Sequence, residues 1–360
     1  MDSIDSGDTD ACGGRLRQGR VLLLLIGFLL ATSILSASVP AASFDVRIQA
    51  WDNREYSTRL TGGDAILAWP GKRITVTPVP ASGEKITPLF RAARSGRGYR
   101  MSATGAMREL RFRIARSGSR ATTETTLWLM IPEPIRVDTS GIVTKGPLAG
   151  YPLGLYPEGV PERYRARARA LSSRFYIVTD SSLRIAPGFA LRDFVSKIRP
   201  ERNWTGRAHP LSLDYGLVNM LEKIESAWRA TGYPGRVRIE SPFRTPDYNN
   251  AGAAGRATFS QHMYGSACDI IFTAEHDRLH DDVDGDGDRD MEDLLPLARK
   301  IESMMKAGEI PKGGIGVYHY IHRDGRAEEF TIHVDLRGRI GKWGSLYDSD
   351  TVKAAADIDW

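Results

Sequence analysis

Hydrophobic and polar residues alternate over short stretches between residues 43 and 136, with turns that contain glycine and proline between them. Alternation with a period of two is typical of strands that bury one face. Several short strands at this spacing predict an all-β, immunoglobulin-like sandwich over residues 43–136. The region contains neither histidine nor cysteine, so we interpret it as a spacer or wall-binding module. The segments with the clearest strand pattern are 44–51, 73–79, 110–116 and 125–131.

The pattern changes after residue 136. A connector is expected over residues 137–204, because residues 146–161 are rich in glycine and proline. A basic helical segment over 162–174 and a short strand-like segment follow this loop. Further along, apolar residues recur at helical spacing over residues 212–232, where a glycine and then Pro234 end the pattern. We expect a second folded domain over residues 205–360.

The first 42 residues follow a different pattern. Arg15, Arg17 and Arg20 precede an uncharged apolar run over residues 21–35, and small residues follow it. This order is typical of an export signal, although the run is shorter than the roughly 20 residues that a spanning helix needs. We therefore expect residues 1–42 to be a signal peptide or a membrane anchor. The rest of the chain is expected in the periplasm or elsewhere outside the cytoplasm, either free or anchored to the inner membrane.

Composition and charge narrow the choice of partner. The chain of 360 residues is 41% hydrophobic and 26% charged, which is ordinary for a globular protein. Its net charge of +5 is spread among interspersed basic and acidic residues, so nucleic acid is not expected as a partner. Cys12 precedes the apolar run and Cys268 follows it, which leaves no disulfide within the exported part.

All seven histidines lie at or after position 209. In the segment SQHMYGSACD, residues 260–269, a glycine and a serine let the backbone turn between His262 and Asp269. Farther on, alternation over residues 330–337 places His333 and Asp335 on the polar face of a strand. Two imidazoles and one carboxylate leave a fourth position open, as in catalytic rather than structural zinc sites. Spacing alone leaves a turn with surface histidines as the alternative.

The spacing Ser-x-His-x-x-Gly-x-Ala-x-Asp resembles the signature of the zinc D-alanyl-D-alanine carboxypeptidase family, which is grouped with lysostaphin-like endopeptidases and the hedgehog signalling domain. Residues 313–318 and 332–343 resemble the end of the same domain in its peptidoglycan-cleaving members. The resemblance covers roughly residues 205–345. It implies a small α+β domain on an antiparallel sheet.

The same resemblance implies a site and a substrate. Zinc would be held by His262, Asp269 and His333. The protein would act as a D,D-carboxypeptidase or an endopeptidase and hydrolyse peptidoglycan stem peptides or cross-links. Arg244 would bind a substrate carboxylate, a role that suits a guanidinium group because it can form two parallel hydrogen bonds.

One departure from the family pattern concerns the general base. Family members usually carry an acidic residue three positions before the last zinc histidine, and Phe330 stands there in this chain. Asp335 is the first substitute, and Glu328 and Glu329, expected in a loop, come next. Asp335 is equally suited to orient a zinc ligand. The missing acid leaves a catalytically weak, zinc-stabilised wall-binding module as an alternative function, and an export-pathway scaffold as a third.

A second metal signal lies in residues 282–293, DVDGDGDRDMED. The segment matches a 12-residue calcium loop with carboxylates at positions 1, 3, 5, 9 and 12 and glycine at position 6. It resembles EF-hand and dockerin loops, with aspartate in place of the final glutamate, and a helical segment follows. We expect structural Ca²⁺ here, with a solvated acidic turn as the alternative. The expected ligands are Asp282, Asp284, Asp286, Asp290 and Asp293, with Asp288 offering its backbone carbonyl.

Overall fold

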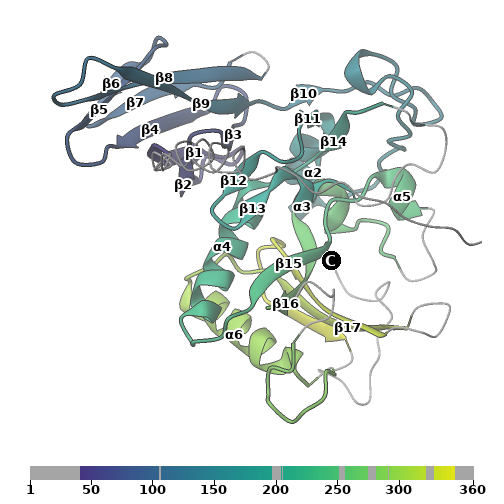
Figure 1. Ribbon diagram of the computed structural model, residues 1–360. Coiled ribbons are helices and arrows are strands. Elements are labelled where there is room, and N and C mark those ends of the chain that lie inside the picture. Colours follow the sequence, from purple (N-terminus) through teal and green to yellow (C-terminus); the bar gives the residue numbers. More distant parts are fainter. Residues whose placement is uncertain are drawn as a thin grey trace, which may run out of the picture. The chain divides into compact units, whose positions relative to one another are not determined.

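The structure is a computed structural model that describes residues 41–104, 107–196, 204, 206–250, 256–274, 281–290, 292–321 and 328–344. The chain divides into two compact units, Met1–Ala41 and Ala42–Trp360. The predicted export segment therefore lies almost wholly outside the described residues. No helix among the described residues is long and apolar enough to cross a membrane. The second unit is α+β, with mostly antiparallel sheets and few helices (Figure 1).

Two sheets form the first part of this unit. Inward-facing residues of the first strand, such as Phe44 and Val46, are buried, whereas Asp45 and Arg47 between them are exposed. The ring of Phe44 lies 4.6 Å from that of Phe112, which brings the two sheets together through one apolar layer. The first sheet has the order β2-β1-β4-β7-β6 and the second β3-β9-β8-β5. Their bounds are β1 Ser43–Gln49, β2 Glu55–Thr61, β3 Ala65–Leu67, β4 Arg73–Val79, β5 Glu84–Pro88, β6 Ala93–Ser95, β7 Gly98–Ser102, β8 Arg108–Arg116 and β9 Thr122–Met130.

All four strands predicted in this region are confirmed, as β1, β4, β8 and β9. The other five are short or carry few apolar residues, so their sequences show no clear alternation. β2, for example, buries only Thr58 and Leu60 along its seven residues. Pairing with β1 over its whole length holds it in the sheet.

The predicted connector is folded into the same core. Its helix α2 and strand β11 confirm the predicted helical and strand-like segments, and β11 pairs with β10 on one side and β14 on the other. The predicted boundary at residue 204 thus falls between two paired strands. The bounds are β10 Glu133–Pro134, η1 Gly146–Leu148, α2 Glu162–Ser173, β11 Arg174–Val178, β12 Arg184–Ala186, β13 Phe189–Ala190, α3 Leu191–Phe194 and β14 His209–Leu211.

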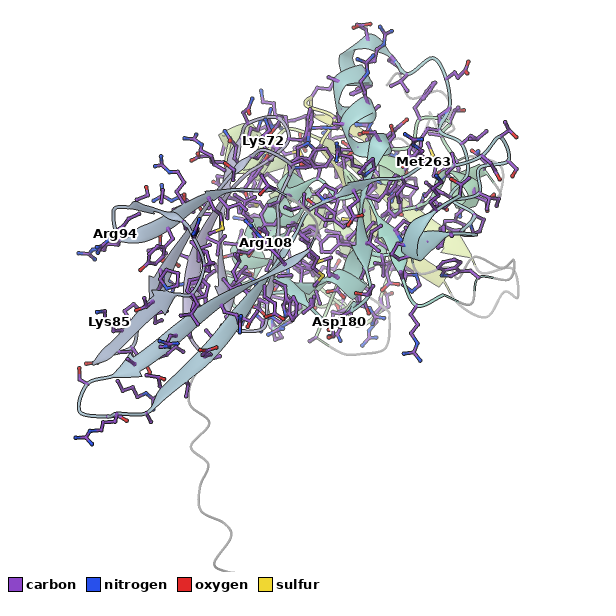
Figure 2. All side chains as sticks on the ribbon, turned by 90° about the horizontal axis from the view of Figure 1, so that it is seen from above. Lys72, Lys85, Arg94, Arg108, Asp180 and Met263 are labelled. Carbon is purple, nitrogen blue, oxygen red and sulfur yellow. The ribbon has the colours of Figure 1, made fainter. Side chains whose placement is uncertain are left out.

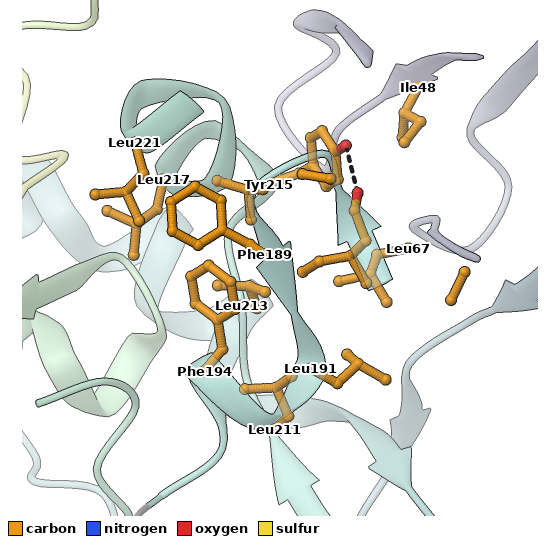
Figure 3. Packing of buried hydrophobic residues seen from close by; sticks show 14 of the residues in the cluster. Ile48, Leu67, Phe189, Leu191, Phe194, Leu211, Leu213, Tyr215, Leu217 and Leu221 are labelled. Atoms are coloured by element: carbon orange, nitrogen blue, oxygen red, sulfur yellow. Dashed lines mark hydrogen bonds between the residues drawn. The ribbon is translucent and has the colours of Figure 1, made fainter. Parts of the chain in front are cut away.

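Buried side chains from all three predicted segments form one continuous apolar cluster. Figure 3 shows Phe189 and Phe194 of the connector region beside Leu217 and Leu221 of helix α4, with Ile48 of β1 nearby. Burial of this shared apolar surface stabilises the sandwich and the later residues together.

The last part of the unit is a five-stranded sheet with the order β15-β16-β18-β17-β19. All neighbours are antiparallel except β17 and β19. Helices α4 and α6 contact its strands, and their apolar residues share the buried cluster with Ile270 and Val334 of the sheet. The bounds are α4 Tyr215–Arg229, β15 Arg236–Ser241, α5 Pro246–Asn250, η2 Gln261–Tyr264, β16 Ala267–Thr273, α6 Leu294–Ala307, β17 Gly314–Ile321, β18 Glu328–Asp335 and β19 Gly341–Gly344.

Helix α4 confirms the prediction over residues 212–232. Asp214 caps its first turn by accepting a hydrogen bond from the backbone nitrogen of Gly216 at 2.9 Å. Leu217, Leu221 and Trp228 recur on the buried face. The expectation that Glu328 and Glu329 lie in a loop was wrong. Both are in β18, because this strand pairs with β17 as far back as Glu328.

Candidate metal centre

Gly265 gives the segment that carries His262 its sharp turn. His262 lies in the short helix η2, and Gly265 follows with a positive φ of 60°, a conformation that side chains with a Cβ rarely adopt. A Cβ on this residue would overlap the backbone carbonyl of Ser212. The chain therefore reverses within a few residues and enters β16, where Asp269 is the third residue. The sharp turn predicted from the sequence is confirmed.

Sheet pairing brings the third predicted ligand to the same place. Asp269 in β16 lies directly opposite His333 in β18. Residues opposite each other in neighbouring strands project from the same face of a sheet. His262 Nε2 lies 3.2 Å from His333 Nδ1 and 3.3 Å from Asp269 Oδ1, and the last two atoms are 2.9 Å apart. All three side chains are buried.

The partners of the two rings decide which nitrogens carry protons. His262 Nδ1 lies 2.9 Å from the carbonyl oxygen of Pro242, which can only accept, so Nδ1 donates and Nε2 has a lone pair. His333 lies between two carboxylates, with Nε2 3.2 Å from Asp335 Oδ2 and Nδ1 2.9 Å from Asp269 Oδ1. Both nitrogens donate when the ring is protonated, and Nδ1 has a lone pair for a metal ion once it loses its proton while Nε2 still donates to Asp335. The lone pair of His262 Nε2 and Nδ1 of His333 therefore both face the same oxygen of Asp269.

Electrostatics at this point favour a cation. Burial lowers the pKa of His262 to about 4, so this ring is neutral near pH 7. Burial opposes ionisation of Asp269, but His262 and Arg244 hold the pKa of its carboxyl well below the usual range. Burial also opposes charge on His333, yet its hydrogen bonds to Asp269 and Asp335 raise its pKa. Three acceptors thus meet at one buried point, which needs a positive charge, either a proton on His333 or a metal ion.

The spacing of the three atoms fits zinc. Nitrogen and oxygen ligands lie about 2.0–2.1 Å from Zn²⁺ in a tetrahedral arrangement, which places ligand atoms roughly 3.3 Å from one another. The observed separations of 2.9–3.3 Å are close to that value. His262, Asp269 and His333 are thus a fitting donor set for a zinc ion, and three protein ligands leave a fourth position.

Asp335 is completely buried and occupied by hydrogen bonds. Its carboxylate accepts from the backbone nitrogen of Gly314 at 2.7 Å, and from Nη2 of Arg337 at 2.6 Å, besides its contact with His333. Burial opposes its ionisation, but His333 and Arg337 hold its pKa far below the usual range. A general base must be free to take up a proton. Of the two roles predicted for Asp335, these contacts favour orienting His333.

Four further residues of this layer were missed from the sequence. Arg337 stacks on the ring of Trp343 with its guanidinium carbon 4.2 Å from the ring centroid. A Cβ on Gly316 would overlap the Trp343 indole, and one on Gly314 would approach the Asp335 carboxylate. The glycines of the segment GGIG leave room for these side chains. The need for these glycines follows from the pairing of β17 with β19, which the sequence does not indicate.

Arg244 contacts a predicted metal ligand directly. Its Nη2 donates to Asp269 Oδ2 at 2.6 Å, and its Nε and Nη2 both donate to the hydroxyl of Ser241. The side chain is 14% exposed. Within the described residues, these bonds leave Nη1 without a recorded partner. Arg244 therefore holds the carboxylate of Asp269 in place and has one nitrogen left for a substrate carboxylate, rather than the full fork that the prediction assumed.

The connector braces the segment that carries His262. The hydroxyl of Tyr156 donates to the carbonyl oxygen of Met263 at 2.8 Å, and its ring stacks on that of Tyr264 with centroids 5.3 Å apart. Gly154 lies so close to the backbone of Asp247 that a Cβ would overlap it. Tyr156 of this glycine- and proline-rich loop thus supports the segment that carries His262, a role that the sequence did not indicate.

Comparison with models of known protein families and with curated proteins gives no match. The metal centre therefore rests on its geometry and on the motif spacing.

The acidic loop over residues 282–293 brings carboxylates together in two groups that share Asp293. Carboxylate oxygens of Asp282, Asp284 and Asp293 lie within 4.8 Å of one another, as do those of Asp288, Asp290 and Asp293. Asp286, a predicted ligand, belongs to neither group among the described residues. Asp288, expected to offer its carbonyl, brings its carboxylate to the second group.

The backbone of this loop is tightly turned. Gly287, at the predicted turn position, has a φ of 99°, and the carboxylate of Asp282 accepts hydrogen bonds from the nitrogens of Gly285 and Gly287. Asp293 is buried and accepts from the backbone nitrogens of Val283 and Asp290. The neighbouring carboxylate of Asp286 raises the pKa of Asp288. The mutual repulsion of these carboxylates is what a bound cation would relieve.

Proposed function

We propose that this protein is an extracytoplasmic zinc peptidase that hydrolyses peptide bonds in peptidoglycan stem peptides or cross-links. One observation carries the proposal. His262 Nε2, His333 Nδ1 and an oxygen of Asp269 meet at one buried point with the separations of zinc ligands. The motif around His262 and Asp269 resembles that of the zinc D-alanyl-D-alanine carboxypeptidases, which supplies the substrate class. The finer fold assignment, a domain of this family after an immunoglobulin-like sandwich, is part of the proposal.

The chemistry divides between the ion and the side chains around it. When bound, zinc lowers the pKa of a coordinated water to about 7 and polarises a carbonyl group. Asp335 fixes the ring of His333, Arg244 fixes Asp269, and the remaining nitrogen of Arg244 binds a carboxylate of the peptide. No described side chain is assigned as the base. Asp335 is occupied by hydrogen bonds, and Glu328 and Glu329, the other candidates, stand in β18 five and four residues before His333, which is about 13 Å or more along an extended strand.

A specific observation favours a second candidate. The carboxylate of Asp335 is buried and fully hydrogen-bonded, and is unsuited to proton transfer. A zinc-stabilised module that binds wall peptides without cutting them needs no base. The two functions differ in whether product is formed.

Cleavage is tested by incubating the full chain with purified muropeptides, with and without a chelator, and analysing the products by mass spectrometry. The peptidase proposal predicts a product that the chelator abolishes and that His262→Ala does not form. His209→Ala serves as the matched histidine control, because His209 lies in β14 outside the centre. Full activity in His262→Ala would reject the metal centre, and chelator-sensitive binding without product would support the second candidate.

Two further assignments belong to the proposal. Residues 282–293 bind a structural Ca²⁺, supported by the two carboxylate groups that share Asp293. Residues 1–42 direct the chain out of the cytoplasm as a signal peptide or hold it at the membrane, supported by their basic, apolar and small-residue order.

A further inference from the structure

The sandwich region carries a concentrated positive charge. Residues 43–136 contain sixteen Lys and Arg against eight Asp and Glu, a net charge of +8, whereas the whole chain carries +5. Figure 2 labels Lys85, Arg94 and Arg108 among these basic side chains, and these three are exposed. The remainder of the chain thus carries a net charge of −3, so the excess positive charge that favours anionic partners is concentrated in the sandwich.

A polar hollow of about 450 Å³ lies on the outer face of the first sheet. Sheet pairing places Arg47 of β1, Thr75 of β4 and Arg100 of β7 side by side in one row across this face. Gly98 forms part of its lining, and a Cβ there would overlap the hydroxyl of Thr77. The missing side chain thus contributes to the concave shape. The volume is in the range of sites for small ligands.

The charges lining the hollow are only partly balanced. Arg73 pairs with Glu55, the one acidic residue of the lining, at 3.5 Å. Arg100 donates to the hydroxyl of Ser95, and no ion pair is recorded for Arg47 or Arg97 in the described part of the chain. Four arginines against one glutamate give the lining a charge of +3. Guanidinium groups without carboxylate partners are suited to bind carboxylates of a ligand.

The composition of the lining narrows the ligand. Its described residues are arginine, glutamate, glutamine, threonine, serine and glycine, with no aromatic or aliphatic side chain among them. Sugar rings and nucleic-acid bases are usually held on aromatic faces, and membrane-binding surfaces insert apolar side chains. A small, polar ligand with more than one carboxylate fits the hollow better than these.

We propose that this hollow binds the free carboxylates of peptidoglycan stem peptides and so holds the wall against the sandwich. The inference rests on the proposed function, which supplies peptidoglycan as the substrate. It assigns to the sandwich a binding role that is separate from the metal centre. Hydrogen bonds from Thr75 and Thr77 add to the ion pairs from Arg47 and Arg100.

The test measures binding to the full chain with His262→Ala, which prevents cleavage. The probe is the tetrapeptide L-Ala-γ-D-Glu-meso-diaminopimelyl-D-Ala, titrated by calorimetry. We expect Arg47→Gln together with Arg100→Gln to weaken binding by about ten-fold or more, since each change removes a charge-assisted contact. Arg113→Gln is the matched control. This arginine lies on the second sheet beside Glu124 at 3.6 Å, so its loss should change the affinity by less than about two-fold.

Two results would overturn the inference. One is equal tetrapeptide affinity in the double variant and the control. The other is binding of the wild type to phosphatidylglycerol vesicles with no binding of the tetrapeptide, which would make the face a membrane surface. Failure of the proposed function looks different, because the wild type would then form no product from muropeptides while arginine-dependent binding of the tetrapeptide would persist.

Discussion

At the residue scale, Gly265 determines whether His262 and Asp269 can reach the same point. Its positive φ is costly for any residue with a Cβ, and the Ser212 carbonyl leaves no space for one. We expect Gly265→Ala to lower the free energy of unfolding by more than about 2 kcal/mol, because it adds a clash to the backbone strain. Urea denaturation measures this. Gly232→Ala is the control, since Gly232 has a φ of 92° and open space around it, and an equal loss in both variants would contradict the role of the clash.

Also at the residue scale, a substitution of Asp335 distinguishes its two predicted roles, orienting His333 and acting as the base. If it orients His333, Asp335→Asn should weaken zinc binding by about 10–100-fold, as removal of such partners usually does. If it is the base, the variant should bind zinc normally and lose only its activity. Zinc affinity, measured by competition with a chromophoric chelator, distinguishes the two outcomes. Asp247→Asn, on the exposed surface of α5, should leave the affinity unchanged.

The three residues predicted as zinc ligands from the sequence are brought together by the fold. The spacing of His262 and Asp269 and the alternation around His333 carry that information locally. Local pattern does not decide between the two predicted roles of Asp335, because one of its partners, the Gly314 backbone nitrogen, is 21 residues away in the sequence. Only the pairing of β17 with β18 places Gly314 beside Asp335.

At the scale of elements, the acidic loop leads directly into α6. Asp293, whose carboxylate belongs to both carboxylate groups, is the residue before that helix. Asp293 is buried and bonded to the loop backbone, so we expect calcium to order the loop and the first turn of α6 together. Isothermal titration of the full chain should show one calcium site. Asp284→Asn should weaken it by about ten-fold or more, because it removes a charged ligand.

Asp286→Asn is the informative comparison for this loop. Its carboxylate belongs to neither carboxylate group, so we expect a smaller change than for Asp284→Asn. If titration of the wild type with calcium gave no binding heat, the site would be rejected. Periodicity predicted α4 because this helix buries an apolar stripe, whereas a strand such as β2 carries few apolar residues and depends on its pairing with β1.

At the scale of the whole molecule, the sandwich and the later residues are joined by polar contacts as well as by the shared core. Thr58 of β2 donates to Glu222 of α4 at 3.3 Å, and Trp51 donates to Asp214 at 3.2 Å. The sequence suggested separate domains because its composition changes near residues 136 and 204. Contacts between segments so distant in sequence leave no local signal.

Glu222 provides a pH test of this association. Burial raises its pKa to about 7 from a usual value of 4.5. The folded state therefore binds more protons than the unfolded state between these values, so the contribution of Glu222 to stability falls as pH rises from about 4.5 to 7. The free energy of unfolding of Glu222→Gln, relative to that of the wild type, should therefore be higher at pH 8.5 than at pH 5 by on the order of 1 kcal/mol. Thermal unfolding at both pH values measures this, and the same difference in Glu124→Gln, on the sandwich surface, would contradict the assignment.

The central claim is that His262, Asp269 and His333 hold one zinc ion, and X-ray absorption at the zinc edge tests it most directly. For the zinc-loaded full chain we expect four nitrogen or oxygen neighbours at about 2.0–2.1 Å, two of them imidazoles. His262→Ala should lose one imidazole from this shell. A chain that binds no zinc, or an imidazole count that is unchanged in His262→Ala, would contradict the account.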